Sequence, residues 1–189
     1  MGIIAKEKLK MSPYRMQNSA FLNEKIKDLR MQKARKLIQG TRPGTLFTDE
    51  KFFTVEANNN GQNHRVIAKD FQTAFLPWSK LHYGNQSWCF QQDGAPAHRA
   101  KATQQWCKNN FPEFISSSEW PASSPDLNSL DYAVWGYLTQ KVSTKNYASL
   151  SALKVALVKA WDEMDANYLR AVVDDYPKRL RAVVKAEGG

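Results

Sequence analysis

The sequence predicts an α/β domain in which a small mixed sheet is flanked by helices. Two segments, 45–56 and 87–91, are rich in apolar, aromatic and β-branched residues and lead into turn residues, which is typical of strands. The last third of the chain has helical spacing instead. With 189 residues, 42% of them hydrophobic, the chain is long enough to form one domain with a sizeable core.

Cysteine and hydropathy patterns give no sign of a secreted or membrane protein. Cys89 and Cys107 make no disulfide framework and lack metal-ligand spacing, which fits a reducing compartment. No apolar run approaches the roughly 20 residues that span a bilayer, and the first residues lack a signal-peptide core. We therefore expect a soluble intracellular protein.

Residues 1–42 are predicted to form a basic lead and a linker helix that ends at Gly40. Between Ala5 and Arg42 there are eleven Lys and Arg and three acidic residues, so this segment carries +8 of the net charge of +9. Such a helix face is either merely solvated or binds phosphate, and the scarcity of acids favours phosphate. The candidate DNA-binding residues are Lys25, Lys27, Arg30, Lys33, Arg35 and Lys36.

The first predicted strand covers 45–56, and a return strand over 64–69 completes a hairpin. Asp49 lies in the middle of the first strand, where an acid is uncommon unless it is paired. The alternative is an edge-strand Asp that faces water. Residues 70–84 have only weak helical spacing, which Pro77 interrupts.

Asp93 comes directly after the strand at 87–91, where Gly and Pro residues turn the chain. An acid in that place is held at a fixed position while its carboxylate stays free, so Asp93 is a candidate metal ligand. A helix over 100–110 and a short strand at 114–115 are predicted to follow.

A further helix is predicted to begin near Asn128 or Ser129, after a loop rich in Pro and Ser, and to run through Lys141. Asp131 falls in its first turn and is expected to point toward the body of the protein. It shares a helix face with Val134, Trp135 and Leu138. Asp126 is interpreted as a loop or capping acid.

Two apolar stripes in the last third of the chain are assigned to packing. The first consists of Leu150, Leu153, Leu157 and Trp161. The second consists of Leu169, Val172, Val173, Tyr176, Leu180, Val183 and Val184. Pro177 is expected to start a new turn within the second stripe.

Asp49, Asp93 and Asp131 converge if the two strands are neighbours and the helix packs across them. Carboxylate oxygens suit Mg²⁺ or Mn²⁺, and two such ions can activate a water or a 3′-hydroxyl and stabilise the leaving oxygen of a phosphodiester. A basic chain with this site is a candidate nucleic-acid phosphoryl transferase. An unrelated metal-dependent phosphatase or nuclease would have the same kind of acidic site.

Three motifs closely resemble the catalytic domain of mariner-like transposases, a family of the acidic-triad transposases and integrases with a ribonuclease H-like fold. They are Phe47-Thr48-Asp49-Glu50-Lys51, Gln91-Gln92-Asp93-Gly94-Ala95-Pro96-Ala97-His98, and the stretch from Trp120-Pro121 to Asp131-Tyr132. Trp135 and the stretch from Tyr176 to Leu180 also look like the family, and the resemblance runs from about Pro13 to Gly189.

The resemblance implies that Asp49, Asp93 and Asp131 are the catalytic and metal-binding residues, with two Mg²⁺ or Mn²⁺ ions. It also implies DNA as partner (transposon ends and target), a homodimer and a nuclear location. His98 matches a family histidine near the metal site, although a lone His at a helix start is equally a capping or packing residue. Trp120 and Trp135 are assigned to the core rather than to DNA stacking.

The chain departs from the family in ways that bear on function. It begins where relatives have completed a pair of helix-turn-helix modules, so sequence-specific DNA binding is not expected. Only 43 residues separate Asp49 from Asp93, an interval in which relatives have a further outer strand and the crossover helix; we expect both to be missing and stability to be reduced. A parallel connection needs about a dozen residues, so the catalytic pair can survive.

These observations predict two domains or segments, 1–42 and a shortened catalytic domain over 43–189. Two functions remain open. The first is transposase-type DNA cleavage and strand transfer, impaired in this copy. The second is a catalytically inactive, transposon-derived protein that binds DNA without sequence preference.

Overall fold

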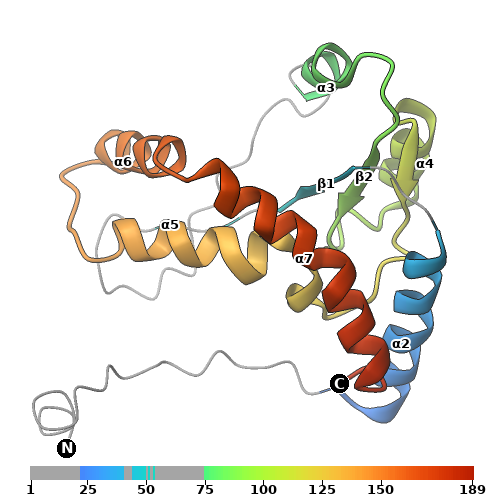
Figure 1. Ribbon diagram of the computed structural model, residues 1–189. Coiled ribbons are helices and arrows are strands. Elements are labelled where there is room, and N and C mark those ends of the chain that lie inside the picture. The colour runs from blue at the N-terminus through green and yellow to red at the C-terminus, as the bar shows by residue number, and fades with distance from the viewer. Residues whose placement is uncertain (1–21, 41–43, 50, 52, 54–74) are drawn as a thin grey trace, which may run out of the picture.

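The structure is a computed structural model that describes residues 22–40, 44–49, 51, 53 and 75–189. In this part of the chain three strands form one sheet with helices on both of its faces (Figure 1). The strands are β1 (Thr45–Thr48), β2 (Cys89–Gln92) and β3 (Glu113–Ile115). The helices are α2 (Glu24–Gln39), α3 (Leu76–Tyr83), α4 (Lys101–Asn110), α5 (Trp135–Val142), α6 (Leu150–Asp162) and α7 (Ala166–Lys185).

The described sheet has the order β1-β2-β3, and both strand pairs are parallel. The expected neighbouring positions of the strands before Asp49 and Asp93 are therefore confirmed. The predicted return strand at 64–69 lies outside the described residues. β1 is shorter than the sequence pattern indicated, because it ends at Thr48. Asp49 thus follows its strand, and the expectation of a mid-strand position was wrong.

Alternation along the strands divides the core between the two sheet faces. Leu46, Phe90 and Phe114 occupy paired register positions and share one face with α3 and α4. Residues of the opposite face pack against α2 and α7, and they include Phe47, Cys89, Ile115 and Trp120. The assignment of Trp120 to the core is therefore confirmed, and both cysteines are buried as well.

α3 occupies the interval between β1 and β2 and covers one face of the sheet. The crossover helix, which we expected to be missing, is therefore present in a short form. Pro77 lies in its first turn, where a proline costs no intrahelical hydrogen bond because that N–H would be unpaired in any helix. The residue that weakened the helical prediction is thus compatible with a helix start.

α7 runs diagonally in front of the sheet, and α2 packs beside its C-terminal half (Figure 1). Pro177 lies inside α7, which continues through it, so the expected new turn is not observed. α5 and α6 form a satellite core around Val134, Leu138 and Ala160. None of the described helices is both long enough and apolar enough to cross a bilayer.

The stripe predictions hold in part. Leu153, Val172, Leu180 and Val183 are buried as expected. Leu150, Trp161 and Val173 are about half exposed. Helical spacing identifies the residues that share a face, but it does not establish that another element covers that face.

Candidate active site

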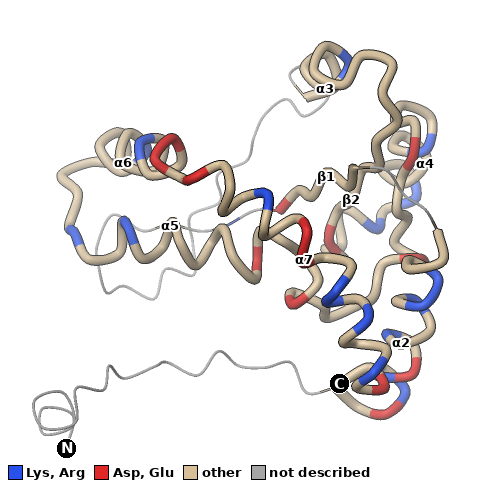
Figure 2. The backbone as a smooth tube through the Cα atoms, in the orientation of Figure 1, with Lys and Arg blue, Asp and Glu red and all other residues tan. Residues whose placement is uncertain are grey.

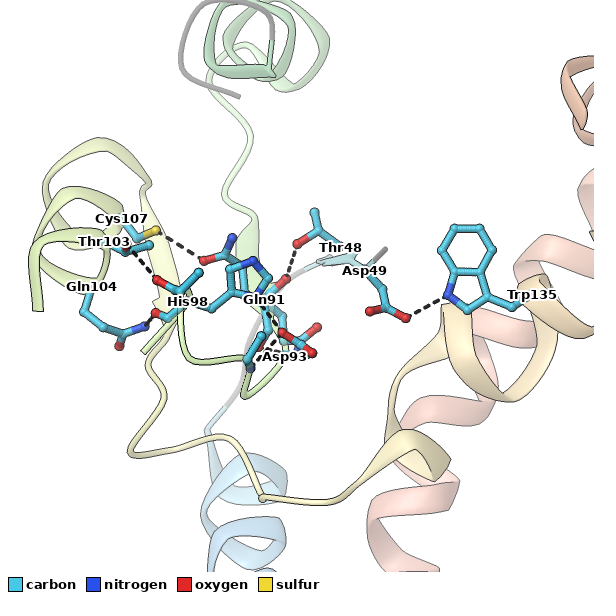
Figure 3. A network of polar contacts seen from close by, with 12 residues as sticks. Thr48, Asp49, Gln91, Asp93, His98, Thr103, Gln104, Cys107 and Trp135 are labelled. Carbon is cyan, nitrogen blue, oxygen red and sulfur yellow. Dashed lines mark hydrogen bonds and ion pairs between the residues drawn. The ribbon is translucent and has the colours of Figure 1, made fainter. Parts of the chain in front are cut away.

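Asp49 and Asp93 lie at the carboxyl ends of β1 and β2 (Figure 3). Thr48 pairs with Gln92 in the parallel register, so the two acids are the next residues on adjacent strands. The carboxyl edge of a parallel sheet is where α/β proteins place their ligands. Strand pairing alone therefore brings together two of the three predicted site acids.

The carboxylate of Asp93 is held by the turn that follows it. Nδ1 of His98 lies 2.5 Å from Oδ1 of Asp93, and the Ala95 N–H donates to the same oxygen at 3.1 Å. The hydrogen bond with His98 is the main reason that the pKa of Asp93 lies below its usual value. Gln104 of α4 donates to the carbonyl oxygen of His98 at 2.8 Å, which fixes this turn. His98 therefore contacts a candidate site acid.

Asp49 is held from the opposite side, by α5. The indole Nε1–H of Trp135 donates to Oδ2 of Asp49 at 2.7 Å (Figure 3). The ring also packs edge-on against Phe53, with centroids 6.3 Å apart. The core assignment of Trp135 was thus incomplete, because its polar edge reaches the site. The sequence signal was available: an indole has one N–H donor, and a half-buried Trp usually finds an acceptor for it.

Asp131 lies in a π-helical turn, Leu130–Val134, that leads into α5. Burial, the charge of Asp49 and a hydrogen bond with that residue raise the pKa of Asp131 to about 6, and Asp93 adds to the effect. Lys51 acts in the opposite direction. The side chain is partly exposed and lies close to Asp49. π-turns are frequent at functional sites.

Two transposases are similar to this chain in amino-acid sequence. The chain is 30% identical over 147 residues to the Tc3 transposase of Caenorhabditis elegans, which covers 75% of this chain and 42% of the relative. It is 27% identical over 118 residues to the Tc1 transposase of the same organism, covering 62% of this chain and 41% of the relative. The chain thus spans about two fifths of these relatives. No family model matches it.

Solved structures of the Mos1 mariner transposase share its fold. The Mos1 catalytic domain with raltegravir and Mn aligns with a TM-score of 0.73 at 18% identity, over 94% of this chain and 98% of that one. The expected resemblance to the mariner-like transposases is confirmed. The Mos1 strand transfer complex aligns with a TM-score of 0.63 at 16% identity, over 98% of this chain and 68% of Mos1. The predicted ribonuclease H-like α/β fold is confirmed.

This mariner-like site has the donor chemistry for a hard divalent cation. Asp49 and Asp131 repel one another across a hydrogen-bonded contact, and a divalent cation between such carboxylates would relieve that repulsion. Among the described residues, no three acidic, histidine or cysteine side chains lie close enough together to hold one ion. The carboxylates of Asp49, Asp93 and Asp131 therefore fit such a cation in kind and charge.

Three of the six candidate DNA-binding residues have partners within the protein. Arg30 is only 3% exposed and forms an ion pair with Asp126, and Lys33 donates to the carbonyl oxygen of Trp120 at 2.8 Å. Lys27 pairs with Glu24 at 3.0 Å on the surface. The basic residues of α2 that remain exposed are Lys25, Arg35 and Lys36. Helical periodicity placed all six residues on one polar face, because it contains no information about the loop at 123–126 that packs against Arg30.

Proposed function

We propose that this chain cleaves DNA strands and transfers them by metal-dependent phosphoryl transfer, as the catalytic part of a transposase. The observation that carries the proposal is the electrostatic linkage of Asp131 to Asp49 and Asp93 at the carboxyl edge of the sheet. The resemblance to the mariner-like transposases supports it. The DNA partner is proposed from relatives, since Mos1 has been solved in a paired-end complex with the left transposon end.

Asp49, Asp93 and Asp131 are the residues that would hold Mg²⁺ or Mn²⁺. When bound, such ions lower the pKa of an attacking water or hydroxyl and stabilise charge on the leaving oxygen. The chain itself contributes orientation. His98 fixes one carboxylate through Nδ1, and Trp135 fixes another through Nε1, so little reorganisation is needed when DNA arrives.

The proposed DNA path includes the exposed basic residues of α2. Lys25, Arg35 and Lys36 are exposed there, and basic residues of α7 lie near them at the lower end of the molecule (Figure 2). Phosphate contacts of this kind position a duplex without reading its sequence. A nuclear location follows from the proposed substrate.

DNA nicking tests the proposal most directly, with Mn²⁺ and a supercoiled plasmid as probes. We expect wild-type protein to nick the plasmid and Asp93→Asn to lose at least about a hundredfold in rate, because a site carboxylate is removed. Asp162→Asn is the matched control, since Asp162 is an exposed acid at the end of α6.

Equal nicking by Asp93→Asn and wild type would refute the assignment of the site. Salt-sensitive DNA binding without nicking by any of the three proteins would instead favour the second candidate, an inactive DNA-binding protein. The observation that keeps this candidate open is that no three His, Cys, Asp or Glu side chains among the described residues are grouped closely enough to hold one ion.

A further inference from the structure

A buried arginine of α2 holds the loop that precedes Asp131. Nη1 and Nη2 of Arg30 donate to the two carboxylate oxygens of Asp126, each at 2.9 Å. This is the bidentate geometry in which guanidinium binds carboxylate most strongly. The remaining bonds of Arg30 go to Ser123 O at 3.0 Å, Ser124 Oγ at 2.8 Å and Gly188 O at 3.0 Å.

The turn after α7 closes this arrangement. Gly188 has a φ of +90°, and a Cβ at this position would lie 2.0 Å from the backbone oxygen of Lys27. Only glycine can therefore bring its carbonyl oxygen to Arg30 along this path. The first and last described helices thus meet at the guanidinium of Arg30.

A second arginine, on α7, holds the same loop from the other side of Asp131. The guanidinium carbon of Arg179 lies 3.6 Å from the ring centre of Tyr132, the residue after Asp131. Its Nη1 donates to the carbonyl oxygen of Asp126 at 3.2 Å. The hydroxyl of Tyr132 donates to the Val172 carbonyl oxygen of α7 at 2.5 Å.

Both arginines thus act on the short stretch of chain that carries the third acid. Asp126 accepts from Arg30 through its side chain and from Arg179 through its backbone, and Tyr132 is held at its ring and at its hydroxyl. The interactions of Asp131 itself are with the other site acids and Lys51. We therefore expect the position of Asp131 to depend on Asp126 and Tyr132, which the two arginines contact.

Stability alone is a poor explanation for this arrangement. The side chain of Arg30 is 3% exposed and that of Asp126 is 44% exposed, and the cost of desolvating such a guanidinium offsets much of the attraction within the pair. In addition, the Nε of Arg179 is buried and has no hydrogen-bond partner within the described part of the chain. A fold under selection for stability alone would not be expected to keep this buried donor unpaired.

We propose that Arg30 and Arg179 are positioning residues that set Asp131 for metal binding. The inference rests on the proposed function for the role of Asp131. The positioning itself can be tested without it. Arg30 reaches Asp131 through Asp126, and Arg179 reaches it through Asp126 and Tyr132. Neither arginine contacts the metal or the DNA in this account.

Hydrogen exchange of the full chain without metal tests the positioning. In Arg179→Lys we expect amide exchange in Leu130–Val134 to accelerate about tenfold or more, while exchange in β2 and α4 stays as in wild type. Arg30→Lys should act in the same direction, because lysine cannot form the bidentate pair. Arg181→Lys is the matched control, since Arg181 is exposed two residues further along α7.

Mn²⁺ titration followed by electron paramagnetic resonance tests the link to the site. We expect the dissociation constant for Mn²⁺ to be about tenfold higher in Arg179→Lys than in wild type, as is usual when a residue that orients metal ligands is replaced. In Arg181→Lys it should equal that of wild type. If Arg179→Lys does not fold, Tyr132→Phe replaces it in both measurements, because it removes only the hydroxyl bond to α7.

Exchange that is unchanged in Leu130–Val134, or that rises equally throughout the chain, would overturn the positioning role. Wild-type Mn²⁺ affinity in a variant with accelerated local exchange would overturn the link to metal binding. If wild type itself binds no Mn²⁺, the proposed function fails, and the exchange measurement alone decides the positioning.

Discussion

The pKa of Asp131 reflects the crowding of carboxylates at the candidate site. Its pKa is raised to about 6 by burial and by Asp49, so the ionised site is strained at neutral pH in the absence of a cation. Below about pH 4 this carboxyl is protonated in both the folded and the unfolded chain. As the pH rises through about 6, the folded protein loses the stability that the protonated form provides.

Asp131→Asn should therefore raise the unfolding midpoint at pH 8 without metal. Because the side chain is exposed, solvent screening reduces the effect to on the order of 1 kcal/mol, or roughly 2–4 °C for a chain of this size. The gain should vanish at pH 4. Thermal unfolding at both pH values measures it, and Asp162→Asn serves as control. A lower midpoint than wild type at pH 8 would show that Asp131 is not under repulsion.

The three candidate site acids stand out in the sequence, whereas their hydrogen-bond partners do not. Asp49, Asp93 and Asp131 stand in motifs with recognisable local context. Trp135 and Arg179 reach the site across 86 and 53 residues of sequence, through contacts with Asp49 and with Asp126. A pattern of local spacing contains no information about such pairs, because they are formed only when separate elements pack together.

At the scale of elements, the basic residues of α2 fall into two groups, one that contacts the rest of the protein and one that stays exposed. Arg30 and Lys33 tie the helix to the loop ahead of Asp131 and to Trp120. Lys25, Arg35 and Lys36 stay exposed. The helix was predictable from its spacing and from Gly40 at its end, whereas its cap, Asn23, was not predicted. The division of its charges was not, because the loop that buries Arg30 comes from residues more than ninety positions later.

Replacing Lys25, Arg35 and Lys36 together with Gln should weaken non-specific DNA binding and reduce its dependence on salt. If all three contact phosphate, the slope of log K against log salt should fall by about 2 to 3 units in magnitude. Titrations over a range of salt concentrations measure this slope. The control is a variant in which Gln replaces three exposed lysines outside α2, namely Lys108, Lys145 and Lys154. An unchanged slope would move the DNA path away from α2.

The whole molecule retains the sheet edge on which the proposed chemistry depends, despite the short interval before Asp93. β1 and β2 pair directly in parallel, and α3 supplies a crossover helix of eight residues. Parallel pairing was expected from the resemblance to the transposase family, and the length of the interval allows it. The length of α3 was missed because Pro77 was interpreted as a break in a helix and not as its beginning.

The central claim is that the three acids form a working metal site in a folded chain. Thermal unfolding with and without Mn²⁺ tests it most directly, with Asp93→Asn and Asp162→Asn alongside wild type. A ligand at 100 times its dissociation constant stabilises the folded state by about 2.7 kcal/mol. We therefore expect the midpoints of wild type and Asp162→Asn to rise by roughly 5–10 °C, and that of Asp93→Asn to rise far less. Equal shifts in all three proteins, or none in wild type, would contradict the account.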